Sequence, residues 1–213
     1  MNKLNLNIDE IDKLTGPVIG RPKSATFRTS DVVGLDTLIK VAGNLFDGLQ
    51  NDEGRKYFKL SDVVLKMEQN KWLGDKTNQG FYKKTKNAKG ETEILTLDLK
   101  TLEYKPKAKT KFTTLESTKS IDNLKERFKV LFAGKDNAGE FYRDSFFGLF
   151  QYVSNRIPEI ADELFKIDDA VCAGFGWDLG PFETWDAVNA EETLRAMELA
   201  GYKPNPWVYE MIS

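Results

Sequence analysis

A passage at residues 19–34 returns, in looser form, at residues 175–189. Phe27 matches Phe182 and Asp31 matches Asp186 at the same separation, while the glycines upstream match with a slip of one residue. A chain of 213 residues is long enough to bury two modest cores. The repeat therefore predicts two related modules.

The composition is that of an ordinary soluble globular protein, with 40% hydrophobic and 30% charged residues. No stretch approaches the roughly 18 apolar residues that would span a bilayer. Residues 1–10 are polar and lack the apolar core of a signal peptide. We therefore expect a cytoplasmic protein without a membrane partner. The single cysteine, Cys172, lies in an apolar run and is interpreted as a packing residue.

The chain contains no histidine, which excludes several kinds of chemistry. Ser-His-Asp and Cys-His nucleophile systems, histidine-ligated zinc and a histidine general base cannot be built from these residues. The glycines at 174, 176 and 180 have the wrong spacing for a dinucleotide fingerprint, and no strand is predicted before them. We therefore predict no catalytic residue, no metal site and no cofactor-binding residue in this chain.

Charge is uneven along the chain although the formal net charge is only −2. Residues 83–111 hold nine lysines against four carboxylates, and the segment after Asp136 is acidic. A basic stretch could attract a phosphate-rich ligand. However, no arginine cluster or interleaved aromatic residues accompany these lysines, so we interpret them as a solvated connector and expect no nucleic-acid partner.

Hydrophobic spacing predicts an all-α architecture with one interruption. Pro158 should kink or restart the long helix of the second half. Short alternating runs at residues 93–98 and 102–104 predict a small β-hairpin between the halves. The predicted helices span residues 38–46, a stretch from Ser61 to the stop at Gly74, and residues 120–132, 141–164, 168–171 and 191–200.

The second half carries a recognisable signature. Gly176, Gly180, Pro181, Phe182 and Asp186 stand in the order G-x-x-x-G-P-F-E-x-x-D. This order resembles the signature of the C-terminal helical domain of 3-hydroxyacyl-CoA dehydrogenases. Residues 154–158, which read S-N-R-I-P, resemble the V-N-R motif that opens that domain.

The first half resembles the same domain. Asp31 and Gly34 lie in a D-V-V-G-L-D run that matches the family's D-x-V-G-L-D. Residues 73–82, which end on Gly80, match its closing L-G-x-K-x-G-x-G-F-Y, with Asn78 in place of a glycine. Residues 15–25 are similar to long bacterial and archaeal members that carry tandem copies of this domain.

The resemblance implies a fold like the C-terminal domain of 6-phosphogluconate dehydrogenase, in two copies. We expect a first domain at residues 1–90, truncated at its N-terminus, a β-hairpin and basic linker at 91–117, and a second domain at 118–213. In the family an NAD-binding Rossmann domain with a catalytic His-Glu pair precedes these helices, and a fused enoyl-CoA hydratase domain often follows in long members. Because this chain shows neither, we expect a fragment that needs its missing NAD-binding domain as a partner.

Two functions remain open. The chain is either the substrate-side and dimerisation region of an NAD-dependent 3-hydroxyacyl-CoA dehydrogenase of β-oxidation, or a purely structural scaffold without a ligand site. The fragment alone is not expected to be catalytic under either. Asn155 is the substrate-binding candidate, because the asparagine of the first N-R motif in single-copy members lines the acyl-CoA thioester site. Its alternative role is helix capping or hydrogen bonding between helices. The signature residues at 31, 34, 80, 176, 180, 181, 182 and 186 are expected to be structural.

Overall fold

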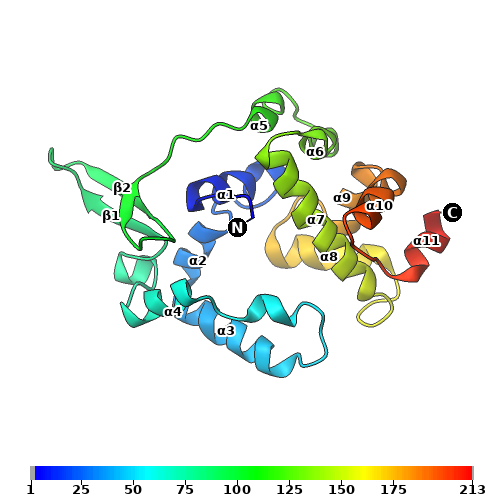
Figure 1. The fold of residues 1–213 in the computed structure, drawn as a ribbon, viewed down its shortest axis with the longest axis horizontal. Helices are drawn as coiled ribbons and strands as arrows, with labels where there is room; N and C mark the ends of the chain where they lie inside the picture. The colour runs from blue at the N-terminus through cyan, green and yellow to red at the C-terminus, as the bar shows by residue number, and fades with distance from the viewer. Residues whose placement is uncertain (1–2, 213) are drawn as a thin grey trace. The chain divides into compact units, whose positions relative to one another are not determined.

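The computed structural model describes residues 3–212 of the chain (Figure 1). The chain divides into two compact units. Unit 1 comprises Met1–Gly16 and Lys23–Thr110, and unit 2 comprises Pro17–Pro22 and Lys111–Ser213. The six residues from Pro17 to Pro22 thus belong to unit 2 although unit 1 flanks them on both sides in the sequence.

Unit 1 combines short helices with one small sheet. Its elements are α1 (Ile8–Leu14), α2 (Phe27–Val33), α3 (Leu35–Gly48), α4 (Asp62–Gln69), the 3-10 turns Arg55–Phe58 and Asp75–Thr77, and strands β1 (Tyr82–Lys86), β2 (Thr92–Leu97) and β3 (Tyr104–Pro106). Ser61 begins α4 as an N-cap, since its side chain accepts a hydrogen bond from the amide of Val64.

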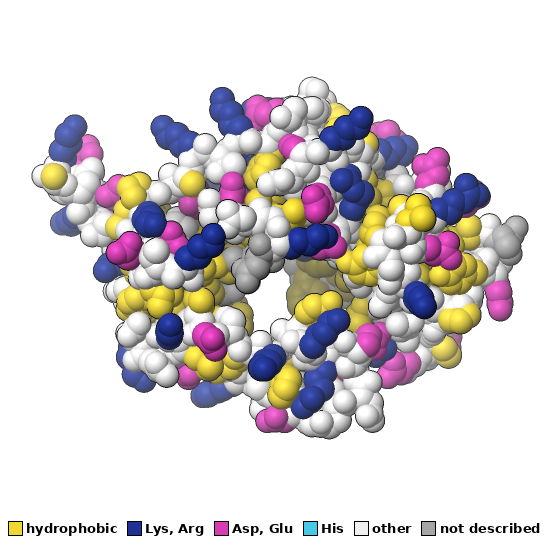
Figure 2. Space-filling model, viewed as in Figure 1, with side chains coloured by type: hydrophobic (Ala, Val, Ile, Leu, Met, Phe, Trp, Pro, Cys, Tyr) yellow, Lys and Arg dark blue, Asp and Glu magenta, His cyan; other side chains and the backbone are white. Residues whose placement is uncertain are grey.

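The sheet is antiparallel, in the order β1-β2-β3, with Tyr82 opposite Thr96 and Leu97 opposite Tyr104. Leu97 is only 2% exposed and joins the core of unit 1. The sheet is therefore part of unit 1, which continues to Thr110, rather than a free connector. Lys84, Lys86 and Lys89, on β1 and in the turn after it, are exposed. Figure 2 shows basic side chains gathered over the end of the β1–β2 hairpin, at the far left of the view.

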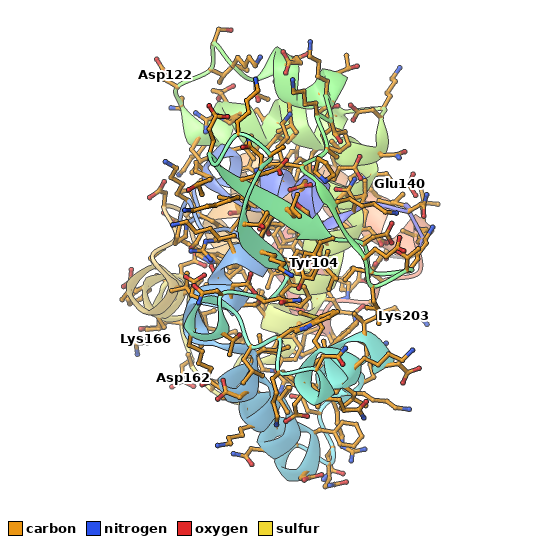
Figure 3. All side chains as sticks on the ribbon, turned by 90° about the vertical axis from the view of Figure 1, so that its left-hand side faces the viewer. Tyr104, Asp122, Glu140, Asp162, Lys166 and Lys203 are labelled. Atoms are coloured by element: carbon orange, nitrogen blue, oxygen red, sulfur yellow. The ribbon has the colours of Figure 1, made fainter. Side chains whose placement is uncertain are left out.

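The core of unit 1 takes one buried residue from each of α1, α3, α4 and β2, and one from the segment just before β1. Its buried members are Ile8, Leu35, Met67, Phe81 and Leu97. Tyr104, labelled in Figure 3, lies on β3 and donates a hydrogen bond to the carbonyl of Gly80 at 2.5 Å. The sheet is thereby held to the segment that precedes β1.

Unit 2 is helical. Its elements are the 3-10 turn Pro17–Ile19, α5 (Thr113–Ser117), α6 (Leu124–Ala133), α7 (Asn137–Asn155), α8 (Leu164–Phe175), α9 (Pro181–Ala187), α10 (Ala190–Leu199) and α11 (Pro206–Ile212).

Aromatic packing between α6, α7 and α9 forms the core of unit 2. Phe128 contacts Phe146 edge-to-face, with ring centroids 5.3 Å apart. Phe150 stacks on Trp185 at 4.8 Å with nearly parallel rings. These rings carry large apolar areas, so their burial contributes to the hydrophobic stabilisation of this core.

The predicted helical architecture with a small hairpin is confirmed. The long helix predicted from residue 141 ends at Asn155, before Pro158, and a new helix begins at Leu164, so Pro158 restarts rather than kinks it. β1 was not predicted, because its lysine-rich sequence lacks the apolar alternation of a half-buried strand. Within residues 3–212, no helix has the length and apolar character needed to cross a membrane.

Candidate functional site

Asp31, on α2, organises the loop that precedes the sheet. Its carboxylate accepts hydrogen bonds from the amides of Phe81 and Tyr82, each at 2.8 Å. Asp31 is 2% exposed. A side chain at Gly74 or Gly80 would overlap Asp31, so both positions must be glycine for the loop to approach this closely.

Burial raises the pKa of Asp31, while its two backbone hydrogen bonds act in the opposite direction. Each of its oxygens is engaged by a backbone amide. Asp31 and Gly80, both predicted to be structural, are therefore in contact, and their arrangement closes a loop.

Gly34 and Asn189, which occupy equivalent places in the repeat, share an unusual backbone conformation. Gly34 precedes α3 with φ of 98°, and Asn189 precedes α10 with φ of 66°. Asparagine tolerates positive φ better than most residues. Its side chain also accepts a hydrogen bond from the amide of Glu192 at 3.3 Å. Asn189, although it is not glycine, therefore has the positive φ that Gly34 has before α3.

A second pair of equivalent residues was missed by sequence reasoning. Asp12, on α1, accepts a hydrogen bond from the amide of Phe27 at 2.6 Å, at the start of α2. Asp168, on α8, accepts one from the amide of Phe182 at 2.8 Å, at the start of α9. In each unit, an aspartate on one helix therefore satisfies free amides at the beginning of another. The available signal is an Ile-Asp pair 15 residues before Phe27 and 14 before Phe182.

The signature glycines shape the entry to α9. Gly176 ends α8 in the left-handed conformation, with φ of 64°. Gly180 lies directly against Asp168, where a side chain would collide with the aspartate. Pro181 is the first residue of α9, and Phe182 is 7% exposed in the core.

Two carboxylates of α9 differ in environment. Glu183 accepts a hydrogen bond from the amide of Gly180 at 3.1 Å, which completes a cap of the helix. Asp186 is exposed. Asp31 is buried and hydrogen-bonded, so the two aspartates that match in the repeat have different surroundings.

Asn155 is the last residue of α7 and is half-buried. The preceding Ser154 is fully buried. Its hydroxyl accepts a hydrogen bond from the amide of Asn205 at 3.0 Å, and its carbonyl accepts one from the indole of Trp207 at 3.0 Å. The C-terminal segment thus fixes the end of α7 and the backbone from which Asn155 projects.

The donor groups present do not fit a metal or a dinucleotide. Among residues 3–212, no three histidine, cysteine, aspartate or glutamate side chains gather in a way that could hold a metal ion. The sheet described above is antiparallel and lacks the parallel βαβ unit and glycine-rich turn on which a pyrophosphate would rest. What the geometry offers is a half-buried amide, Asn155, on a braced helix end.

Comparison with known proteins places these features in a family. Residues 1–84 match the model of the 3-hydroxyacyl-CoA dehydrogenase C-terminal domain. A protein of Bacillus subtilis named as a probable 3-hydroxyacyl-CoA dehydrogenase is 41% identical over 212 residues, covering 100% of this chain and 26% of the relative. A Deinococcus radiodurans protein with the same name is 43% identical over 96 residues, covering 45% of this chain and 27% of the relative.

A more distant relative extends the comparison. A Rickettsia prowazekii protein with the name "Putative fatty acid oxidation complex trifunctional enzyme" is 25% identical over 181 residues, which cover 84% of this chain and 23% of the relative. The chain thus spans about a quarter of the length of the relatives it matches. No solved structure matches. The resemblance to the 3-hydroxyacyl-CoA dehydrogenases is confirmed: residues 1–84 match the model of the family's C-terminal domain, and the whole chain aligns with part of a protein named as a probable 3-hydroxyacyl-CoA dehydrogenase.

Proposed function

We propose that this chain forms the substrate-side helical region of an NAD-dependent 3-hydroxyacyl-CoA dehydrogenase of fatty-acid β-oxidation. The observation that carries the proposal is the 41% identity to the Bacillus subtilis relative, because that alignment covers both halves of the chain. The enzyme would oxidise the 3-hydroxyl group of a fatty acyl-CoA, and the helices would wall the cleft that receives the acyl-CoA.

NAD and the proton-transfer groups would come from a separate Rossmann domain. The chain has no histidine, so a His-Glu pair cannot be assembled from it. Its described sheet is a short antiparallel one, which does not suit a dinucleotide. Hydride transfer would therefore need the partner domain, and we expect the isolated chain to be inactive. Dimerisation through these helices, as in the family, is part of the same proposal.

Asn155 would position the substrate. A side-chain amide can donate to the thioester carbonyl of an acyl-CoA and orient it without changing charge. The bracing of Ser154 by Asn205 and Trp207 supports this role, because a positioning group must be held within a fraction of an ångström.

The alternative is a structural scaffold with no ligand site. It is favoured by the carboxylates of Asp31 and Asp168, which are both engaged by backbone amides of their own unit. Under this alternative, Asn155 stabilises the end of α7 and does nothing else.

Substitution of Asn155 by alanine in the complete enzyme separates the two. A substrate role predicts a raised KM for acetoacetyl-CoA with little change in melting temperature, whereas a scaffold role predicts unchanged kinetics and lowered stability. Asn137→Ala is the matched control, because Asn137 is an exposed asparagine at the other end of α7. A KM that moves equally in both variants would contradict the positioning role.

Calorimetry on the isolated chain asks how much of the site it holds. Heat with acetoacetyl-CoA but not with NADH would mean that the helices carry a self-sufficient part of the acyl-CoA site. No heat with either ligand would leave the site in the cleft with the Rossmann domain. Heat with NADH would contradict the assignment of NAD to another domain.

A further inference from the structure

The segment Pro17–Pro22 lies between α1 and α2 in sequence, yet it packs within unit 2. Ile19, at its centre, is 4% exposed. An ordinary loop between two helices of unit 1 would be expected to remain on the surface of that unit. Unit 2 therefore offers contacts specific enough to hold six residues of backbone.

Arg127 of α6 provides the first of these contacts. One nitrogen of its guanidinium donates to the carbonyls of Pro17 and Val18, at 3.4 and 3.3 Å. The other two nitrogens donate to the carbonyl of Ile121, at 2.8 and 3.0 Å. The guanidinium is thus held by the turn that precedes α6 as well as by the segment.

Gly20 provides the second contact. Its carbonyl accepts a hydrogen bond from the amide of Asp178 at 2.8 Å, in the loop between α8 and α9. Its φ is 67°, and a Cβ atom there would collide with the side chain of Leu124. Only glycine combines this conformation with this close approach.

Arg21 provides the third contact. Its guanidinium carbon lies 3.6 Å from the ring centroid of Trp177 and 5.6 Å from that of Phe146. Burial lowers the pKa of Arg21 to about 10, so the group remains a cation at neutral pH. A partly desolvated cation on an indole face is a strong and oriented contact.

We propose that the surface of unit 2 formed by Leu124, Arg127, Trp177 and Asp178 is a binding site for the segment Pro17–Pro22. The bound segment holds the two parts of the chain together even when the connection at residues 107–111 is cut. It also fixes Trp177 and Asp178, which lie between the signature glycines Gly176 and Gly180. The proposal does not depend on the function proposed above.

The test uses the full chain with a protease site inserted among residues 107–109, which are exposed. After cleavage, the two pieces should elute together from a size-exclusion column at low micromolar concentration. The double variant Gly20→Val/Arg21→Ala should raise their dissociation constant by about tenfold or more, the size expected from a desolvated cation–π contact. Lys23→Ala, at an exposed lysine just beyond the segment, should leave it unchanged.

Hydrogen exchange on the uncut chain guards against a variant that simply unfolds. In the double variant, the amide of Asp178 should exchange faster, because displacement of the segment takes the backbone carbonyl of residue 20 away from that amide. The amide of Phe182, held by Asp168, should stay protected and report that unit 2 is still folded. The proposal is overturned if the unsubstituted pieces separate, or if the double variant leaves both the association and the Asp178 exchange rate unchanged.

Discussion

Removal of the Asp168 side chain should destabilise unit 2, and the hydrogen bonds of this carboxylate allow the loss of free energy to be estimated. The carboxylate is 5% exposed and accepts hydrogen bonds from the amides of Phe182 and Glu183, at 2.8 and 2.9 Å. Hydrogen bonds to a charged group contribute about 1.5–3 kcal/mol each. The net effect must be smaller than their sum, because burial raises the pKa of Asp168 and shows that the ionised group carries a desolvation cost.

We therefore expect Asp168→Ala to lower the free energy of unfolding by about 3 kcal/mol. Urea unfolding followed by tryptophan fluorescence measures this directly, since Trp177, Trp185 and Trp207 all lie in unit 2. With a urea dependence of about 2 kcal/mol per molar, the midpoint should fall by roughly 1.5 M.

Asp169→Ala is the matched control, because it removes the same charge from the adjacent, exposed position of α8. It should change stability by no more than about 0.5 kcal/mol. Asp168→Asn should also be destabilising, since an amide presents only one acceptor oxygen to two backbone donors. Equal midpoints for the two alanine variants would refute the assignment of Asp168 as the anchor of α9.

Three further expectations follow from the same structure. Gly80→Ala should lower the free energy of unfolding, measured by thermal melting, by about 2–3 kcal/mol, because the added methyl group would overlap Asp31. Gly43→Ala, which has open space on α3, should raise it by up to about 1 kcal/mol. Effects of the same sign in the two variants would contradict this. Lys105 and two backbone amides lower the pKa of Asp98 to about 2. The contribution of the ionised Asp98 to stability is therefore present above about pH 4 and is lost as the pH falls through 2. An NMR titration of Asp98 with a midpoint near 4 would disprove this assignment. Asn189→Ala should lower the free energy of unfolding by about 1–2 kcal/mol, because alanine tolerates the positive φ poorly and cannot cap α10. Asn189→Gly should lower it by less in the same melting experiment.

The parts of the fold that the sequence predicts are those with local signals. The apolar spacing of α3, the Ser61 cap of α4 and the proline after α7 are each contained in a few neighbouring residues. β1 has no such signal. Its five residues form a strand because they pair with β2, and their own sequence shows no alternation of apolar and polar residues. The same difference explains why two helices as short as α1 and α2 were not predicted.

The site residues differ in the same way: sequence motifs identify some of them, but contacts between distant residues cannot be predicted from those motifs. The resemblance to a family selected Asp31, Gly34 and Gly80, but it could not say that Asp31 and Gly80 touch. The sequence predicted Asp168 at the start of a helix, whereas it lies within α8, and it gave no role to Asp12, because a buried aspartate that caps another helix looks, in sequence, like any surface aspartate. Only the repeated Ile-Asp pair, set at nearly the same distance before each phenylalanine, distinguishes them.

At two pairs of matched positions in the two halves, the local geometry agrees although the residue type or the spacing differs. Gly34 and Asn189 differ in type but keep a positive φ, and Asp12 and Asp168 keep their acceptor role at the start of α2 and α9. By contrast, Asp31 and Asp186 are the same residue type in different surroundings. Asp31 accepts hydrogen bonds from the amides of Phe81 and Tyr82, beside Gly80, whereas Asp186 is exposed to solvent. A helix junction needs a particular backbone conformation and paired amides, so a residue type that recurs at matched positions is weaker evidence for a shared role than a shared hydrogen bond.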